Sequence, residues 1–300
     1  MKQLNRAAYI PSSDVEGSDH VAASLRAFCL RTAILAIRSL HAELVLYPKP
    51  GLVSPIDNGS HTDMDADVFM RSLFSLRHYF IQITHAGAQA APFSALKELG
   101  VQAERRMLTA TGGINTHRGA IFSLGLLCAA AGYCHAHALS LSAIRQVLIK
   151  QWGEGLAAHA MPSVASLSNG IRVAHLYAVG GARAEGAQGF PAVFDIGVPQ
   201  LHQSFANGST ACDAQIDALF SLMARITDTN IYHRGGSDGA MLVQQSAQRF
   251  MQLGGTAHPD WRSAALECHH LFVRENLSPG GAADMLSASW FVYQLSQVTE

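Results

Sequence analysis

The sequence lacks the patterns that would place the protein in an oxidising compartment or in a membrane. No C-x-x-C pair occurs and no secretory apolar segment follows Met1, so we expect reduced thiols, no disulfide and no structural zinc. The five cysteines are Cys29, Cys128, Cys134, Cys212 and Cys268. The longest uncharged apolar run, Gly119 to Cys134, is shorter than the ~20 residues that cross a bilayer. These absences predict a soluble, cytoplasmic protein.

An excess of charge of one sign is also missing. The formal net charge is −1, from 21 basic and 22 acidic residues, so the chain as a whole attracts neither nucleic acid nor an anionic membrane. Histidine is frequent, with 15 residues, but His135-Ala-His137 and His269-His270 lack helical ligand spacing and no H-E-x-x-H occurs. We therefore expect a small-molecule pocket in which a local cluster holds any anion, and no histidine-built metal site.

Signals for β-strands and for internal repeats are absent as well. Apolar residues recur at helical spacing through most of the chain, and no segment alternates apolar and polar residues over a strand length. With 49% hydrophobic residues, a chain of 300 residues can bury a large core. We expect an all-α protein, with a flexible arm over residues 1–19 and a single compact domain of about ten or more helices over residues 20–300.

The helical periods and their Pro and Gly boundaries define the expected elements. Helices are predicted over residues 20–47, 65–90, 93–109, 120–133, 140–158, 164–179, 213–225, 238–253, 259–274 and 280–297. The Gly-rich segment 179–191 is interpreted most simply as a connector. Glu43 lies near the end of the first helix, where the helix dipole disfavours a carboxylate, so it is either a solvated side chain or a residue that serves another purpose.

The segment Thr111 to Gly125 has the composition of an anion site at the start of a helix. Two glycines let the backbone adopt positive φ, two polar residues can cap the following helix, and a histidine and an arginine add donors in its first turn. These residues are Gly112, Gly113, Asn115, Thr116, His117 and Arg118. The alternative is an ordinary capped helix after a glycine turn, and no Walker loop is present.

Residues 48–65 form a second candidate, a loop that is stiffened by prolines and dense in polar side chains. Lys49 lies between two prolines, which fixes the position from which its charge can reach a phosphate. Asp63 and Asp65 supply oxygen ligands that suit Mg²⁺, although one of them could simply cap the next helix. Capping does not account for Asn58 and His61, so we expect this loop to bind a ligand.

Mixtures of acidic, basic and amide residues occur at other predicted helix junctions. They comprise Glu104, Arg183, Glu185, Asp228, Asn230, Arg234, Ser278 and Asp284. Each alone could be ordinary turn chemistry. Together with the two segments above, they suit a polyphosphate that is bridged by a metal ion. We therefore expect the junctions to converge on one water-poor cavity, with cationic and N–H groups at one end and acids at the other.

The motifs occur, in order, as in a known family. They are Pro48-Lys-Pro-Gly-Leu-Val53, Gly59-Ser-His-x-Asp-Met-Asp65, Glu104 with Met107, Thr111-Gly-Gly-Ile-Asn-Thr-His-Arg-Gly119, Gly181-Ala-Arg-Ala-Glu185 with Gly189-Phe-Pro191, Asp228-Thr-Asn230 with Arg234-Gly-Gly236, and Ser278-Pro-Gly-Gly-Ala-Ala-Asp284. From about Leu25 to Leu295, the chain resembles triphosphoribosyl-dephospho-CoA synthase. The resemblance implies an all-helical enzyme that joins ATP to 3′-dephospho-CoA and releases adenine.

The resemblance also implies a destination for the product, 2′-(5″-triphosphoribosyl)-3′-dephospho-CoA. This compound is the precursor of the prosthetic group of an acyl carrier protein, and a separate transferase acts on that carrier protein. Ser54 stands where many relatives have Asp, and Ser60 stands where many have Ala. Because these residues look closer to the malonate decarboxylase branch, we expect that pathway, with citrate lyase as the alternative.

The implied reaction inverts the anomeric carbon, so a single displacement by the 2′-hydroxyl of dephospho-CoA needs no enzyme nucleophile. We expect Asp63 or Asp284 to be the base, and His61 or His117 to protonate adenine. The residues expected to hold Mg²⁺ on the triphosphate are Asp65, Glu104 and Asp228. Phosphate charge is expected to meet Lys49, Arg118, Arg183 and the Gly112–Gly113 turn. Further nucleotide contacts are predicted for Asn58, Asn115, Thr116, Glu185, Asn230, Arg234 and Ser278.

Two other classes of function fit parts of the pattern. A Mg²⁺-dependent helical hydrolase would use the same acids to cleave an N-glycosidic or phosphoester bond with water, and it would make no joined nucleotide. A helical nucleotide-binding or scaffold protein would use the glycine turns only as connectors and would release no adenine. The clustered acids favour an enzyme, because buried carboxylates without a purpose would destabilise the fold.

Overall fold

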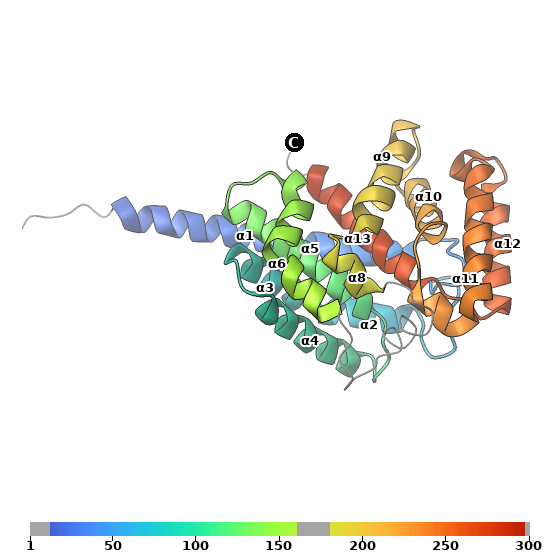
Figure 1. Ribbon diagram of the computed structural model, residues 1–300, viewed down its shortest axis with the longest axis horizontal. Helices are drawn as coiled ribbons and strands as arrows, with labels where there is room; N and C mark the ends of the chain where they lie inside the picture. The colour runs from blue at the N-terminus through green and yellow to red at the C-terminus, as the bar shows by residue number, and fades with distance from the viewer. Residues whose placement is uncertain (1–12, 161–180, 298–300) are drawn as a thin grey trace, which may run out of the picture.

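The computed structural model describes residues 13–160 and 181–297, and this part of the chain forms twelve α-helices, short 3₁₀ and π-helical turns and no strand (Figure 1). The helices are α1 (Ser13–Val45), α2 (Ala66–Ser75), α3 (Arg77–Ala88), α4 (Phe93–Ala110), α5 (Arg118–Ala136), α6 (Ile144–Ala160), α8 (Ala182–Ala187), α9 (Val198–Ala206), α10 (Ala211–Met223), α11 (Thr229–Gln252), α12 (Trp261–Arg274) and α13 (Gly280–Gln297). The prediction of an all-α fold is confirmed. The helix predicted over residues 164–179 lies outside the described residues.

Helix α5 is the centre of the fold, and 13 of its 19 residues are buried. It packs against α1, α3, α4, α6 and α13. The approach of α3 to α5 depends on glycine, because a Cβ at Gly87 would collide with the backbone of Ala129, and one at Gly132 would collide with the carbonyl of Thr84. By length and composition α5 could cross a membrane, but 72% of its apolar window is buried inside the protein. A helix that is apolar on all sides is what the middle of a multi-helix core requires.

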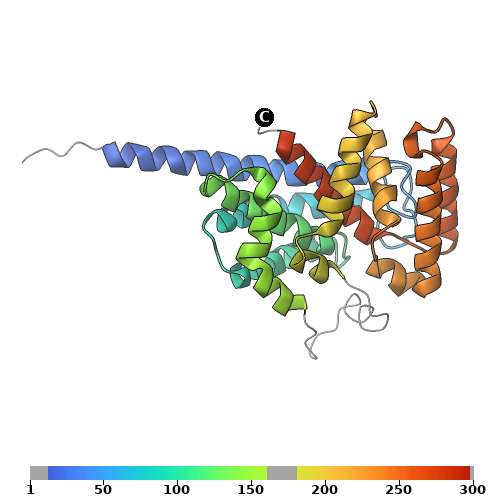
Figure 2. The same ribbon diagram turned by 45° about the horizontal axis from the view of Figure 1, so that its top comes forward.

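The other helices are arranged around α5 along a long axis. The N-terminal part of α1 extends beyond the rest of the molecule, and α11 and α12 lie side by side at the opposite end (Figures 1 and 2). Helices α9, α10 and α13 pack together between α5 and that end. The loop over residues 46–65 connects the end of α1 to α2 and runs beside α12. This arrangement brings the starts of several helices to one region of the molecule.

Several predicted boundaries differ from the structure. Helix α1 begins at Ser13, so the predicted arm over residues 1–19 overlaps the helix. The single helix predicted over residues 65–90 is two helices, since the N–H of Leu76 bonds to the carbonyl of Leu73 at 3.1 Å and leaves the α-helical pattern. Helix α11 begins at Thr229 instead of residue 238, and its interruption at Gly236, with φ 61° and ψ −154°, is where the sequence indicated a loop.

The Gly-rich segment that the sequence indicated as a connector contains helix α8 and leads into a π-helical turn, η2 (Ala192–Gly197), and helix α9. Its glycines serve close packing. A Cβ at Gly186 would lie 2.9 Å from the ring of Phe122, and Gly189 adopts φ +73° where a Cβ would lie 2.8 Å from Ile149. The glycines therefore hold α8 against α5 and α6, and a composition that is typical of loops is used here for contact between helices.

Candidate active site

A cavity of about 1380 Å³ opens where the starts of α5, α8, α11 and α13 meet the loop over residues 46–65 and helix α4. Its lining includes acids, bases and amides from every junction that the sequence singled out. Pockets that bind one drug-sized molecule occupy about 300–1,000 Å³, so this cavity has room for more than one such ligand.

Asp228 joins the starts of two helices at this cavity. It is the N-cap of α11, where its carboxylate accepts a hydrogen bond from the N–H of Asn230 at 2.9 Å, and it also accepts one from Ala282 in the first turn of α13 at 3.1 Å. The N–H groups of Gly281 and Ile231 further stabilise the ionised form. Burial still raises the pKa of Asp228 above its ordinary value, because the carboxylate is removed from water.

The position of the Asp228 carboxylate depends on two glycines at the start of α13. A Cβ at Gly281 would lie 2.9 Å from the carboxylate of Asp228, and a Cβ at Gly280 would lie 3.0 Å from the side-chain amide nitrogen of Asn230. The Gly280-Gly281 pair therefore lets the first turn of α13 approach the first turn of α11. The sequence indicated a cap with glycines at this point, and the structure gives the physical reason for them.

Asp284 lies one turn further along α13 and faces the start of α5. The N–H of Ala120 bonds to its carboxylate, and a Cβ on Gly119 would collide with it. Burial and the neighbouring carboxylates of Asp228 and Glu43 raise the pKa of Asp284 well above its ordinary value. The starts of α5, α11 and α13 thus surround two acids, of which Asp228 is buried and Asp284 is half-buried, and the positive ends of the helix dipoles stabilise the negative charge.

Lys49 does not face the cavity. Its side chain is 1% exposed, and its ammonium donates a hydrogen bond to Oε1 of Glu43 at 2.6 Å. Burial lowers the pKa of Lys49, and the carboxylate of Glu43 acts in the opposite direction. Glu43 itself lines the cavity. In the structure the ammonium of Lys49 is therefore engaged by Glu43, and the phosphate contact that the sequence indicated for Lys49 stays a prediction.

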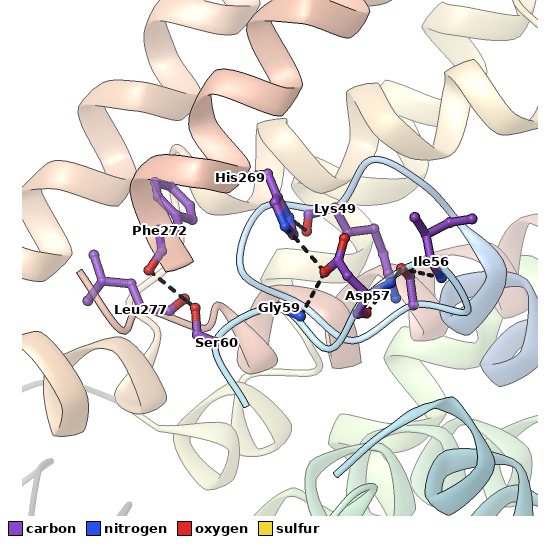
Figure 3. Close-up of polar contacts among 9 residues, drawn as sticks. Lys49, Ile56, Asp57, Gly59, Ser60, His269, Phe272 and Leu277 are labelled. Carbon is purple, nitrogen blue, oxygen red and sulfur yellow. Dashed lines mark hydrogen bonds and ion pairs between the residues drawn. The ribbon is translucent and has the colours of Figure 1, made fainter. Parts of the chain in front are cut away.

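The loop over residues 46–65 is fixed against α12 (Figure 3). The carboxylate of Asp57 lies 3.2 Å from Nε2 of His269, which in turn bonds through Nδ1 to the carbonyl of Lys49 at 3.0 Å. Ser60 donates its hydroxyl to the carbonyl of Leu277 at 2.6 Å. A Cβ on Gly51 would collide with the same carbonyl. The loop is therefore pinned at both halves, as the figure shows for the residues that it labels.

His61 connects this loop to α11 and α13. Its Nε2 lies 2.8 Å from Oγ of Ser278, and its Nδ1 lies 3.1 Å from Nη2 of Arg234. Arg234 also donates to the carbonyl of Ser60 at 2.9 Å. Burial and the charge of Arg234 lower the pKa of His61 below its ordinary value. Asp63, at 3.7 Å from Nδ1 of His61, has a side chain that is 63% exposed and does not line the cavity.

His117 is the N-cap of α5 and is 3% exposed. Thr116 donates its hydroxyl to Oγ of Ser72 at 2.6 Å, and the same oxygen lies 2.6 Å from Nδ1 of His117. Because Ser72 Oγ accepts the hydroxyl hydrogen of Thr116, its own hydroxyl hydrogen is free to be donated to Nδ1 of His117. Nδ1 is then the acceptor, and the neutral ring carries its proton on Nε2. Nε2 is buried and has no hydrogen-bond partner among the described residues. Burial and the charge of Lys49 lower the pKa of His117 to about 3, so the ring is neutral near pH 7.

The predicted metal ligands do not lie together. Asp65 caps α2 through the N–H of Val68 at 2.8 Å, and Glu104 forms an ion pair with Arg118 at 2.6 Å. Within residues 13–160 and 181–297, no group of three His, Cys, Asp or Glu side chains could hold a metal ion. Of the predicted metal ligands, Glu104 and Asp228 line the cavity, whereas Asp65 does not.

The glycine turn before α5 lies outside the cavity, and its predicted contact with phosphate stays a prediction. Gly112 and Gly113 adopt φ +68° and +94°, as a turn requires, but both are exposed and nothing lies within 4 Å of a Cβ built on either. Asn115 accepts a hydrogen bond from the N–H of Arg118 at 3.2 Å, so the predicted capping residue does contact the start of the helix. The turn directs the chain into α5 but does not line the cavity.

Helix α8 contributes the remaining predicted residues. Nη1 of Arg183 donates to the carbonyl of His159 at 3.1 Å, and Oε2 of Glu185 accepts from the N–H of Ala192 at 3.1 Å. Burial lowers the pKa of Arg183, and burial raises that of Glu185. The predicted site residues that line the cavity are His61, Glu104, Asn115, Thr116, His117, Arg118, Arg183, Glu185, Asp228, Asn230, Arg234, Ser278 and Asp284. Those that do not are Lys49, Asn58, Asp63, Asp65, Gly112 and Gly113.

Sequence reasoning did not select seven titratable residues of the lining, which are Glu43, Tyr79, Lys97, His159, Asp195, Arg225 and His233. Three of them matter most for the charge of the cavity, and only one of these three gave a signal in the sequence. Glu43, which lines the cavity, was noted as an acid in an unfavourable place near a helix C-terminus. Lys97 and His159 also line it, but they belong to α4 and α6 and lie far from every motif in the sequence. Their position follows only from how those helices pack.

Comparison with known proteins identifies relatives over nearly the whole chain. A profile of the family described as ATP:dephospho-CoA triphosphoribosyl transferase matches residues 29–300. The probable 2-(5''-triphosphoribosyl)-3'-dephosphocoenzyme-A synthase of Acinetobacter calcoaceticus is 38% identical over 283 residues, which cover 94% of this chain and 96% of that protein. The 2-(5''-triphosphoribosyl)-3'-dephosphocoenzyme-A synthase of Pectobacterium atrosepticum is 38% identical over 269 residues, covering 85% and 86%. No solved structure gives a significant match.

Proposed function

Since the chain belongs to the ATP:dephospho-CoA triphosphoribosyl transferase family, we propose that it transfers the 5-triphosphoribosyl group of ATP to the 2′-hydroxyl of 3′-dephospho-CoA and releases adenine. The observation that carries this proposal is a pair of acids, the buried Asp228 and the half-buried Asp284, facing one cavity of about 1380 Å³. The volume suits two nucleotides, and carboxylates beside the sugars suit a transition state that resembles an oxocarbenium ion.

The proposed step breaks the bond between C1′ of the ATP ribose and N9 of adenine, and forms a bond between C1′ and the 2′-oxygen of dephospho-CoA. The hydroxyl proton passes to a carboxylate, and adenine leaves with one proton, so the reaction has no net proton change. Asp284 is the better placed of the two predicted bases, because it lines the cavity while Asp63 is exposed outside it. Its raised pKa makes its carboxylate a stronger base than an ordinary aspartate.

His117 is the group that we propose assists the departing adenine. Its ring is neutral near pH 7 and lines the cavity. Its Nε2 has no hydrogen-bond partner among the described residues and is buried, so it can donate a hydrogen bond to a ring nitrogen of adenine only if nucleotide binding uncovers this atom. His61 is engaged with Ser278 and Arg234, and these contacts support a positioning role. The lowered pKa of each histidine favours hydrogen bonding over transfer of a full proton near pH 7.

Mg²⁺ fits this site only as an ion that the nucleotide carries. Mg²⁺ commonly binds through one or two carboxylates together with substrate phosphates. Asp228 would face such an ion, which when bound neutralises phosphate charge. The described residues hold no group of three candidate ligands, so this part of the chain alone does not provide a cage. The chain's own contribution is to hold the acid in a fixed orientation between two helix starts.

For the pathway, we propose malonate decarboxylase as the destination, with a separate transferase that uses the product to modify its acyl carrier protein, in the cytoplasm. This choice is supported by the serines at positions 54 and 60, where many relatives have Asp and Ala, respectively. Both are used by the loop over residues 46–65: Ser54 accepts from the N–H of Asp57 at 3.2 Å, and Ser60 bonds to α12 and the turn after it. Supplying the product, with the partner transferase, to each of the two apo carrier proteins tests the pathway.

The reaction is tested by incubating the purified protein with ATP, dephospho-CoA and Mg²⁺ and measuring products by mass. Equal amounts of adenine and joined nucleotide are expected. Adenine that appears without dephospho-CoA would identify a hydrolase instead, and a protein that binds nucleotides but releases no adenine would be a binding protein. The three functions are thus separated by one assay.

A further inference from the structure

Three basic side chains from three helices line the cavity together: Lys97 of α4, His159 of α6 and Arg183 of α8. We call them the basic wall. Burial first, and then the charges of Arg183 and Lys97, lower the pKa of His159 to about 4. Arg183 donates to the carbonyl of His159 at 3.1 Å, and the ring of His159 lies 5.7 Å from that of Phe93.

The two permanent charges of this wall are not neutralised. Within the described ranges, no carboxylate lies within ion-pair distance of Lys97 or Arg183. The neighbouring acids of the lining have other partners, since Glu104 pairs with Arg118 and Glu185 accepts from the backbone of η2. Arg225 and Arg234 of the lining are also in no ion pair among the described residues, but the basic wall is where two such cations lie beside one imidazole and face the cavity.

The surroundings strengthen an interaction with an anion. Phe93 and Leu96 of α4 and Phe122 of α5 line the same cavity, and apolar walls lower the local dielectric. Arg183 is partly buried, and burial lowers its pKa, which shows that its charge is not fully solvated. A partly buried cation without a counter-charge is stabilised by an anionic ligand.

The basic wall offers an anion side-chain cations, whereas the helix starts beside Asp228 and Asp284 offer only backbone N–H groups. The N–H groups of Asn230 and Ala282 already bond to Asp228, and that of Ala120 bonds to Asp284. Those helix starts therefore hold carboxylates, and phosphate charge must be met elsewhere in the cavity. Arginine and lysine side chains are the groups that proteins use for phosphate at such places.

We propose that Lys97, His159 and Arg183 form a polyphosphate subsite, which holds the phosphate chain of one of the two nucleotides while Asp228 and Asp284 face the sugars. The identity of the ligand rests on the proposed function, under which two sources are available: the triphosphate of ATP and the diphosphate of dephospho-CoA. Lys97 and Arg183 bind the chain through charge, and the neutral imidazole of His159 donates one further hydrogen bond.

The test uses Lys97→Gln in the full chain, because Lys97 is exposed at the cavity wall and its replacement leaves the core unchanged. The KM of one nucleotide should rise about tenfold while that of the other stays within about twofold. The nucleotide whose KM rises identifies the source of the phosphate chain. Lys97→Arg should restore most of the affinity. The matched control is Lys150→Gln, which should change neither KM. Lys150 is an exposed residue of α6 that does not line the cavity.

Binding without turnover separates this subsite from the reaction. Calorimetric titration with inorganic triphosphate and inorganic diphosphate should show binding that Lys97→Gln weakens about tenfold and Lys150→Gln leaves unchanged. If the wild type binds these probes in this way but releases no adenine, the proposed function fails and the subsite stands. If Lys97→Gln changes neither KM nor probe affinity, or raises both KM values equally, the subsite is refuted, whatever the reaction.

Discussion

Replacing Asp228 by alanine should affect stability and catalysis separately, because the carboxylate has two tasks. It accepts hydrogen bonds from Asn230 at the start of α11 and from Ala282 at the start of α13, and Gly281 and Ile231 add further N–H groups. Asp228→Ala leaves these buried donors without their acceptor. The helices themselves stay formed, since most of their length is packed elsewhere, so the circular dichroism spectrum of the folded variant should be unchanged.

The magnitude follows from counting caps. Loss of one N-cap side chain costs about 0.5–2 kcal/mol, and Asp228 caps two helices, so the variant should lose about 1–4 kcal/mol of unfolding free energy. Thr210→Ala is the matched control, because Thr210 is an exposed N-cap that serves α10 alone through the N–H of Asp213 at 3.2 Å. That variant should lose about 1 kcal/mol and retain full activity. Urea unfolding followed by circular dichroism measures both.

Asp228→Asn then separates the cap from the charge. The amide oxygen can still cap one helix, but the amide nitrogen faces the N–H groups of the other, so stability should lie between those of the wild type and Asp228→Ala. Adenine release should be lost in both variants. The reasoning is refuted if Asp228→Ala is no less stable than Thr210→Ala, or if Asp228→Asn releases adenine at the wild-type rate.

Three further changes test the buried parts of the site. Gly119→Ala should reduce adenine release at least tenfold, because its Cβ collides with Asp284, and unchanged activity would show that this acid is not held against α5. His117 should make stability fall as pH drops below 6.5 toward about 3, because only the unfolded state gains its proton. Between about pH 7 and about pH 5 the wild type should lose about 2 kcal/mol more than His117→Asn in urea unfolding, and parallel pH curves would contradict the buried neutral ring. Lys49→Met should destabilise by about 3–5 kcal/mol in thermal or urea unfolding, and adding Glu43→Gln should recover part of the loss, whereas additive losses would exclude the ion pair.

The helical class and most helix positions could be predicted from the sequence, because apolar periodicity is a local property. Helix α13 was predicted at its observed bounds, 280–297, and α4 within one residue, at 93–110. The errors occur where glycine has a use that composition cannot reveal. Gly186 and Gly189 look like a flexible connector, yet they bring a helix against Phe122 and Ile149. A rule that assigns glycine to loops has no access to the partner helix.

The sequence predicted which helix junctions contribute residues to the candidate site, but it did not predict which side chains contact one another. His61, Arg234 and Ser278 were selected from separate motifs, and the structure brings them into one hydrogen-bonded group. Lys49 was selected for its place between prolines, but its side chain turns into the core toward Glu43. Side-chain direction is set by packing around the loop, and a motif carries no information about it.

The positions of the N–H groups change how the site should be understood. A helix start with glycine and polar residues resembles a phosphate site in sequence, and phosphates were expected at one end of the cavity with acids at the other. In the structure the starts of α11 and α13 hold Asp228, and the start of α5 holds Asp284. Their dipoles reduce the free energy needed to bury negative charge, which lets two carboxylates persist in a place poor in water. Negative charge fixed there in advance would stabilise a sugar that becomes positive as its base departs, and it would repel any phosphate whose charge a bound Mg²⁺ does not neutralise. The phosphate chains must then meet side-chain cations, which is why the basic wall and the acid pair are complementary parts of one site.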